Sequence, residues 1–410
     1  MRLLESRAPF ILGISAAPAS IAVSEGLLFA AALFRLAQCV RGRAPLRPAR
    51  LVWLWLAWFG LVLVAWAFSP EPDLGWSEIR HVLWMGAVII TAPALDRASD
   101  RLAAWQGVFL VGALSSLVLI GEFIHRLVVF NDEIAAGGEA GFYLRSGGLL
   151  HHWMVYATVE IVVVAGLLSF WFAYPEKRRQ WSIVAAIHGA AVLLSLTRML
   201  WVACLLLAGI ALAWRRPMWV LAVPLLASGV YIGAPDGVRL RISESFDMSH
   251  YSNSERLQML QVGWRMARDN PLTGVGPGRV EKLYTSYLAP KDSVPAYHGH
   301  LHNNIVQIAA QFGLPVALAG CVLAGVLFKD LLRARRRAAN RDEQFIAETA
   351  LLALTGFVFA GLFEYTYGHS LGVIMLAFAV APAFCPHPEG VANTGRHGGA
   401  VGAVYDRAGV

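Results

Sequence analysis

The sequence has little charge for its length, and this scarcity limits what the protein can be. Only 15% of its 410 residues are Asp, Glu, Lys or Arg, whereas 57% are hydrophobic. Apolar runs of membrane-spanning length recur from end to end, which excludes a soluble globular protein. These runs lack the period-two alternation of transmembrane β-strands. We therefore expect an all-α integral membrane protein.

Cysteine is also scarce, with four residues in the chain: Cys39, Cys204, Cys321 and Cys385. All four fall within or at the ends of apolar runs. None has metal-ligand spacing to another, and none lies in a polar loop where a disulfide would be expected. We interpret them as small hydrophobic side chains.

About twelve apolar segments can be read as transmembrane helices, of which the first two are the shortest or least apolar. They are Pro9–Val23, Gly26–Val40, Leu51–Phe68, Ile79–Leu95, Leu102–Phe123, Trp153–Phe172, Trp181–Thr197, Met199–Trp214, Met218–Ala234, Asn303–Phe328, Phe345–Thr366 and Leu371–Phe384.

The distribution of Lys and Arg predicts the orientation of these segments. Basic clusters fall on alternate connections, which places them all on one side: Arg41–Arg50, Arg97–Arg101, Lys177–Arg179, Arg215–Arg216 and Lys329–Arg341. Because short cytoplasmic loops are enriched in Lys and Arg, this side is predicted to be the cytoplasm, with both termini on it. Basic clusters in short membrane loops do not indicate a nucleic acid partner; the partners expected from them are membrane lipids.

Two longer segments lie on the predicted outer side, at about His125–His152 and Pro235–His302. We expect a single membrane domain over residues 1–385, with a periplasmic loop at 235–302 inserted in it. The Gly-rich tail at 386–410 is expected to be disordered and cytoplasmic. The N-terminal run up to Ala19 imitates a cleaved signal peptide, but the topology works best if it is retained.

The larger outer loop contains a predicted helix. The capping-box spacing of Ser252–Glu255 predicts a helix from about Asn253 to Asp269. On this helix Arg256 falls in the apolar sector, whereas Arg265 falls in the polar one; the apolar sector contains Met259, Leu260, Trp264 and Ala267. A surface helix normally keeps Arg out of its buried stripe, so we expect Arg256 to reach a partner beneath the helix.

Three histidines, His298, His300 and His302, alternate where this loop meets the apolar run that starts at Asn303. Imidazole titrates near neutral pH and can take a proton from a hydroxyl. A solvated helix cap with interfacial histidines is one alternative, and a zinc site is another. Imidazoles alone at alternate positions fit tetrahedral zinc poorly. We therefore predict a general base and neither a metal nor another cofactor.

Arg198 is expected at an outer turn between two spans. The basic loops on either side of it, Lys177–Arg179 and Arg215–Arg216, are both predicted to be cytoplasmic and lie about one helical hairpin away. An Arg left in hydrocarbon costs about 3 kcal/mol on insertion scales, so it should face a polar cavity or an anion; the alternative is snorkelling to the headgroups. Glu364 lies near the outer end of another predicted span. It could orient a histidine or bind an arginine, or be a plain interfacial carboxylate.

Residues distant in the chain are thus predicted at one membrane face: His300, His302, Arg198, Arg256, Arg265 and Glu364. A base and several guanidinium groups beside lipid suit a lipid-linked pyrophosphate, since Arg binds phosphate in a bidentate manner. Attack by a deprotonated hydroxyl from the opposite face would invert the anomeric carbon. For a metal-dependent transferase the only carboxylate candidate is Glu71-Pro-Asp73, which is a weak pattern.

Three motifs resemble the O-antigen ligase/polymerase family of bacterial envelopes. They are Thr197-Arg198, the loop Arg256…Trp264…Asn270-Pro-Leu-Thr-Gly-Val-Gly-Pro-Gly278, and His300-Leu-His-Asn303…Gln307…Gly313-Leu-Pro315. The resemblance implies a GT-C-like membrane fold and metal-independent glycan transfer from undecaprenyl pyrophosphate at the periplasmic face of the inner membrane. For an O-antigen ligase the acceptor is the lipid A-core oligosaccharide of lipopolysaccharide.

The resemblance also implies roles for individual residues. His302, or else His300, is the expected base, and Arg198 with Arg256 or Arg265 the expected pyrophosphate ligands. The expected supporting residues are Asn303, Glu364 and Gly276. One departure is Gln311, where relatives often have Glu.

Four functions remain open. A ligase suits the chain length and the single principal outer loop, whereas O-antigen polymerases often carry two sizeable outer loops. A protein O-oligosaccharyltransferase usually has a larger C-terminal outer region. A transporter or flippase would be expected to have charges near mid-membrane and a duplicated half. Here no repeat is visible, and the polar residues are expected to collect at one face.

Overall fold

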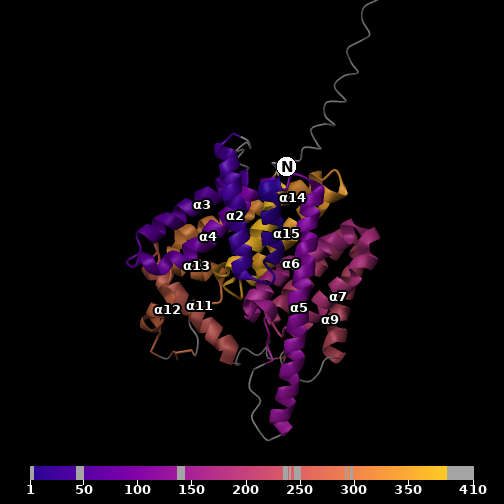
Figure 1. The fold of residues 1–410 in the computed structure, drawn as a ribbon. Coiled ribbons are helices and arrows are strands. Elements are labelled where there is room, and N and C mark those ends of the chain that lie inside the picture. The colour runs from indigo at the N-terminus through magenta and orange to yellow at the C-terminus, as the bar shows by residue number, and fades with distance from the viewer. Residues whose placement is uncertain are drawn as a thin grey trace, which may run out of the picture.

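The computed structural model describes residues 4–42, 50–135, 144–233, 239, 242–243, 251–290, 292, 294–295 and 299–385. Every regular element in these residues is a helix, as the all-α prediction requires (Figure 1). The first nine are α1 (Leu4–Ala16), α2 (Ile21–Val40), α3 (Arg50–Ala67), α4 (Trp76–Thr91), α5 (Ala98–Ala135), α6 (Trp153–Ala173), α7 (Arg178–Leu194), α8 (Arg198–Arg215) and α9 (Ala222–Gly233). They are followed by α11 (Tyr251–Asp269), α12 (Val280–Leu283), α13 (Asn304–Phe312), α14 (Leu314–Arg337), α15 (Arg341–Ala360) and α16 (Ser370–Val380). The predicted tail and His298 lie outside the described residues.

Seven helices in the described part of the chain are long and apolar enough to cross a membrane: α2, α3, α5, α6, α8, α14 and α15. Many large apolar side chains on the outside of the bundle are exposed, for example Leu318 at 64% and Val322 at 65% on α14. Lipid is the solvent that suits such a surface. The integral membrane class is therefore confirmed. Each of the twelve predicted segments contains a helix, but the number of spans stays a prediction.

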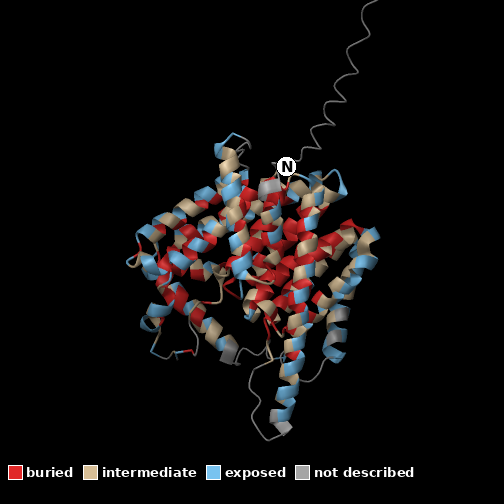
Figure 2. Cartoon of the chain, in the orientation of Figure 1, coloured by how far each residue is buried: buried red, intermediate tan, exposed pale blue. Residues whose placement is uncertain are grey.

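Helices α6, α15 and α16 form the centre of the bundle, where buried residues dominate (Figure 2). Inside the bundle, Glu160 of α6 and His188 of α7 lie 2.6 Å apart, and the other ring nitrogen of His188 is 3.1 Å from the carbonyl of Phe109 on α5. The expectation that polar residues collect at one face is wrong for this pair. Both ring nitrogens of His188 and Oε1 of Glu160 thus have a partner, which lowers the cost of placing them inside a membrane bundle.

Polar contacts join the helix connections at each of the two ends of the bundle. At one end, here named the basic end, the ion pairs are Arg7–Asp96, Arg7–Asp100, Arg50–Asp330, Arg215–Glu348 and Arg341–Glu176. The opposite end, here named the α11 end, carries α11, α12 and α13; the N-terminus lies away from it (Figure 1). Except for Glu348, which lies near the start of the predicted span Phe345–Thr366, these ion pairs join residues outside the predicted spans that were predicted on the same side, in agreement with the alternation of loops.

The predicted span Asn303–Phe328 is wrong in one respect, because it consists of two helices that meet at Gly313. This residue has φ 88°, and a Cβ there would lie 2.3 Å from the carbonyl oxygen of Leu272. Only glycine fits such a position. Helix α13 packs against α11. It belongs to the α11 end, and the crossing helix begins at Leu314.

Helix α11 begins at Tyr251, so Ser252 lies inside it and the predicted capping box is wrong. The expected apolar sector also differs, because Trp264 is 56% exposed. The buried side is centred on Val262 and Gly263, where Leu301 packs so closely that a Cβ on Gly263 would be 2.4 Å from its Cδ1. Because Gly263 has no side chain, Leu301 can pack against this side of α11, and this contact sets which face of the helix is buried.

Candidate active site

The turn that contains His302 is held in one conformation by its neighbours. His302 has φ 51°, which is uncommon for a residue with a side chain. The backbone N–H of Leu301 donates to the side-chain oxygen of Gln307 at 2.8 Å. Asn303 caps α13, since its side-chain oxygen accepts the N–H of Val306 at 2.9 Å. The strained conformation of His302 is therefore supported from both sides.

The same turn is tied to the segment that follows α15. Asn303 donates through Nδ2 to the carbonyl of Leu362 at 2.9 Å, and the N–H of Asn304 donates to the carbonyl of Gly361 at 2.7 Å. A Cβ at Gly361 would lie 2.2 Å from Asn304 Nδ2, so a larger residue would displace the Asn304 side chain. These contacts bring Glu364 to His302 from 62 residues away in the chain.

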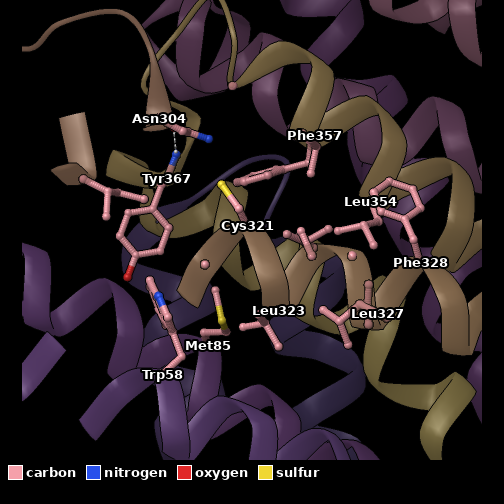
Figure 3. A pocket seen from close by; sticks show the side chains of 18 of the residues that line it. Trp58, Met85, Asn304, Cys321, Leu323, Leu327, Phe328, Leu354, Phe357 and Tyr367 are labelled. Atoms are coloured by element: carbon pink, nitrogen blue, oxygen red, sulfur yellow. Dashed lines mark hydrogen bonds between the residues drawn. The ribbon is translucent and has the colours of Figure 1, made fainter. Parts of the chain in front are cut away.

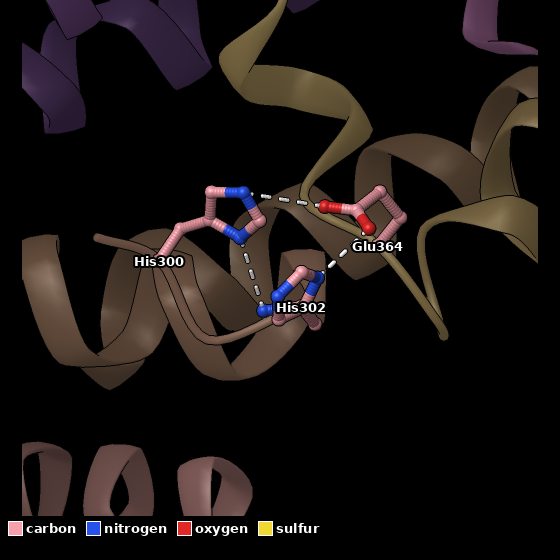
Figure 4. Close-up of side chains that lie close together, drawn as sticks. All are labelled: His300, His302 and Glu364. Atoms are coloured by element: carbon pink, nitrogen blue, oxygen red, sulfur yellow. Dashed lines mark hydrogen bonds and ion pairs between the residues drawn. The ribbon is translucent and has the colours of Figure 1, made fainter. Parts of the chain in front are cut away.

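Glu364 is the centre of the polar cluster that results (Figure 4). It is fully buried, and its Oε2 lies 2.8 Å from His302 Nδ1. Its other oxygen lies 3.4 Å from His300 Nε2. Arg256 Nη2 is 3.9 Å from Oε2, and Arg256 Nη1 donates to the carbonyl of Phe363 at 3.2 Å. The structure thus gives Arg256 the partner expected beneath α11.

Burial and charge set the protonation of this cluster. Burial alone would raise the pKa of Glu364, but the hydrogen bond from His302 and the positive charges of His302, His300 and Arg256 lower it to about 2. Burial lowers the pKa of His300 to about 4, and the charge of Glu364 offsets this only in part. At neutral pH the carboxyl of Glu364 is therefore ionised and His300 is neutral.

The two histidines use their ring nitrogens differently. His300 accepts the backbone N–H of His302 at Nδ1 and faces Glu364 with Nε2, so both nitrogens hold the turn together. His302 faces Glu364 with Nδ1 at 2.8 Å, so we assign the Nδ1–H tautomer from this hydrogen bond. Nε2 of His302 then carries the lone pair that can accept a proton.

The same three side chains could hold a metal ion, because ligand atoms of His300, His302 and Glu364 lie within 4.8 Å of one another. Two imidazoles and one carboxylate suit Zn²⁺. The sequence argument against zinc considered the histidines without Glu364, which the structure brings next to them. In the structure, a metal would compete with the hydrogen bond between His302 and Glu364. The absence of a metal stays a prediction.

The predicted pyrophosphate ligands occupy different surroundings. Arg198 is the first residue of α8, and its Nη1 is buried. Helix α7 starts beside the basic end, so α8 starts at the α11 end, where it packs against α6 and α15. Arg265 instead donates to the carbonyl of Tyr287 at 2.7 Å and pairs with Asp292 at 3.1 Å. These contacts hold α11 to the segment after it.

Gly276 supports packing of the glycine-rich loop. It has φ 104°, and a Cβ there would be 2.4 Å from the hydroxyl of Ser69. Its N–H donates to the carbonyl of Gln311 at 3.1 Å. The structure therefore accounts for this glycine by close approach of the backbone.

Glu71, from the only carboxylate pair considered for a metal, is bound by two cations. Lys282 Nζ lies 2.6 Å from it and Arg279 Nε 3.0 Å. The hydrogen bond from Lys282 is the main cause of its lowered pKa. This carboxylate joins the turn after α3 to the segment around α12.

An apolar cavity of about 440 Å³ opens beside the turn of His302 (Figure 3). Asn304 and Tyr367 line one end of it, and Asn304 is two residues from His302. From there it continues between α3, α4, α14, α15 and α16 toward Phe328. The sequence did not indicate this cavity, because its wall is made of side chains from six helices, α13 included.

Residues 181–321 match the sequence model of the O-antigen ligase family. This match supports assignment of the chain to the O-antigen ligase/polymerase family. No curated protein matches it. The match contains Arg198, Arg256, Arg265, His300 and His302, whereas Glu364 lies beyond it.

Members of the O-antigen ligase family are glycosyltransferase-type enzymes that use lipid-linked polysaccharide donors and lipid acceptors. This chain is accordingly a multi-pass membrane enzyme of the O-antigen ligase/polymerase type. The cluster around Glu364 joins the matched region to the end of α15, so the site extends past the matched residues.

Sequence reasoning missed one buried network. The hydroxyl of Tyr365 donates to Glu78 at 2.5 Å and also lies 3.2 Å from Oε1 of Gln311, whose Nε2 is 3.3 Å from Glu78. A Glu at position 311 would place a second carboxylate against Glu78, so the amide is the residue that fits here. An acidic residue at the edge of an apolar run was the available signal.

Proposed function

We propose that this chain is an O-antigen ligase that transfers a glycan from undecaprenyl pyrophosphate to a hydroxyl of the lipid A-core oligosaccharide. The observation that supports this most is the His302–Glu364 pair, which lies beside Arg256 and is close in the chain to Asn304, a residue at one end of an apolar cavity. We place the reaction at the periplasmic face of the inner membrane, with the basic end in the cytoplasm.

His302 is the general base in this proposal. Its Nε2 takes the proton of the acceptor hydroxyl while the oxygen attacks the anomeric carbon of the donor glycan. The new C–O bond forms as the bond to pyrophosphate breaks, so attack from the opposite face inverts the carbon. Glu364 stabilises the imidazolium that results and keeps the ring oriented, and His300 positions the turn.

The leaving pyrophosphate needs positive charge at the same end of the bundle. Arg256 already lies at the cluster, 3.9 Å from Glu364. Arg198 opens α8 at this end. Both can present the planar fork that binds phosphate oxygens in pairs. Arg265 contributes by holding α11 in place, unless it exchanges Asp292 for the donor. No metal takes part in this scheme.

The polyprenyl chain of the donor is placed in the apolar cavity. Its wall contains Trp58, Met85, Cys321, Leu327 and Phe357, which offer only hydrocarbon, aromatic and sulfur surface to a ligand there. A chain bound in it would end beside Asn304, next to the proposed base. The cavity thus explains how a lipid and a polar reaction can meet at one point.

The test is lipopolysaccharide analysis in a strain that lacks this chain and receives either the wild type or His302→Ala. We expect the variant to insert in the membrane but leave bare core, with polymer still on undecaprenyl pyrophosphate. Core capped by a single repeat would identify a polymerase instead. Transfer to protein would identify an O-oligosaccharyltransferase, and full activity of His302→Ala would refute its role as base.

A further inference from the structure

A second group of ring side chains extends away from the proposed base. The guanidinium carbon of Arg145 is 5.6 Å from the centre of the Trp153 ring. Trp153 stacks on His152 with centroids 4.5 Å apart, and His152 lies 6.5 Å from His369. We name these four residues the α6 platform, because Trp153 is the first residue of α6. No step of the proposed reaction uses them.

The α6 platform carries polar groups that have no hydrogen-bond or ion-pair partner in the part of the chain that the structure describes. Nε1 of Trp153 and Nε2 of His369 are buried and have no hydrogen-bond partner among the described residues. No acidic group in the described part of the chain pairs with Arg145. Buried donors without a partner cost free energy, so such groups point to a ligand. The indole N–H of Trp153 and the guanidinium of Arg145 can only donate hydrogen bonds. A ligand that binds them must therefore offer acceptor oxygens.

The platform adjoins the proposed active site. The charge of Glu364 reaches both His369 and His152, where it raises each pKa against the larger lowering effect of burial. The charge of a protonated His369 in turn lowers the pKa of His300. Burial lowers the pKa of His369 to about 4, so its ring is neutral at neutral pH and can bond a hydroxyl. A ligand on the platform would thus lie next to the reacting atoms.

We propose that the α6 platform binds a sugar that bears a phosphate or carboxylate group and that belongs to one of the two glycan substrates. This proposal rests on the proposed function. The faces of the Trp153 ring are taken by His152 and Arg145, so the indole meets the sugar with its edge, and Arg145 binds the anionic substituent of the sugar. The indole N–H and the imidazole of His369 bond its oxygens. The platform therefore recognises the glycan, whereas Arg256 and Arg198 bind pyrophosphate.

The test measures glycan binding to the purified protein in nanodiscs by titration calorimetry. The probes are a phosphorylated core oligosaccharide freed from lipid, the same after phosphatase treatment, an acidic O-antigen repeat, and the same after carboxyl reduction. We expect the wild type to bind one of the anionic probes about tenfold more tightly than its uncharged counterpart. Arg145→Gln should remove that preference, and Trp153→Phe should weaken binding of both forms.

Arg268→Gln is the matched control, since Arg268 is 66% exposed on α11 and pairs with its neighbour Asp269. It should keep the preference. Preference for the core probe assigns the platform to the acceptor, and preference for the repeat assigns it to the donor. Equal binding of charged and uncharged probes, or a preference that survives Arg145→Gln, overturns the proposal. Because binding needs no turnover, a wild type that binds but transfers nothing refutes only the reaction.

Discussion

Glu364→Gln tests whether a buried carboxylate makes His302 a base. Gln keeps the shape of the side chain and can still accept the N–H of Tyr365, which lies 3.1 Å from Glu364. It removes the negative charge and can donate to Nδ1 of His302, which would move the ring proton to Nε2. The variant should therefore fold but hold its histidine in the wrong tautomer.

The expected loss follows from the distance between carboxylate and imidazole. At an effective dielectric constant of about 20, opposite charges 2.8 Å apart attract each other by about 6 kcal/mol. Part of this is offset because both groups have lost water. With about 1.4 kcal/mol per tenfold in rate, we expect kcat to fall by about 10³-fold to 10⁴-fold.

The assay is single-turnover transfer of a labelled glycan from its polyprenyl pyrophosphate to saturating acceptor, with the protein in nanodiscs. Glu281→Gln is the control, because it is the same substitution on an exposed residue at the same end of the bundle. The control should be as active as the wild type. If Glu364→Gln is folded and keeps more than about a tenth of the wild-type rate, Glu364 does not direct the base.

Four further predictions follow from the same contacts. Arg198→Lys should lose most of its activity, because a point charge cannot replace the planar fork; unchanged turnover and donor affinity would show that Arg198 binds no phosphate. Ala324→Trp, which narrows the apolar cavity, should raise KM about tenfold for a long-chain polyprenyl donor but not for a short-chain analogue, measured side by side. Treatment with EDTA should leave transfer unchanged, and a loss that Zn²⁺ restores would contradict the scheme without metal. Stability should fall as pH drops from 6.5 to 4, because the pKa values of His300 and His369 are lowered from 6.5 to about 4 and the unfolded chain binds their protons first. Each histidine should contribute a slope of up to about 1.4 kcal/mol per pH unit, and a melting temperature that is flat over this range would refute their burial as neutral groups.

Part of the site was predictable because its residues carry a local signal. An imidazole pair beside Asn303, or an arginine between two apolar runs, is visible in a few neighbouring positions. The covered face of α11 was not predictable in this way. It depends on Leu301 packing at Gly263, a contact between segments that the sequence does not place side by side. The break at Gly313 was missed for a similar reason, since the run on both sides of it is continuously apolar.

The sequence by itself determined that this protein is surrounded by lipid, that it is helical, and which helix connections lie on the same side of the membrane. These properties follow from hydropathy and from the positions of Lys and Arg, which are summed along the chain and need no contacts. The tertiary structure alone decided which groups meet. It brought Glu364 to His302, placed Gln311 against Glu78, and left one polar atom each of Trp153 and His369 without a partner among the described residues. Hydrogen bonds and ion pairs act over a few ångströms, so their partners are set by how helices pack and not by their separation in the chain.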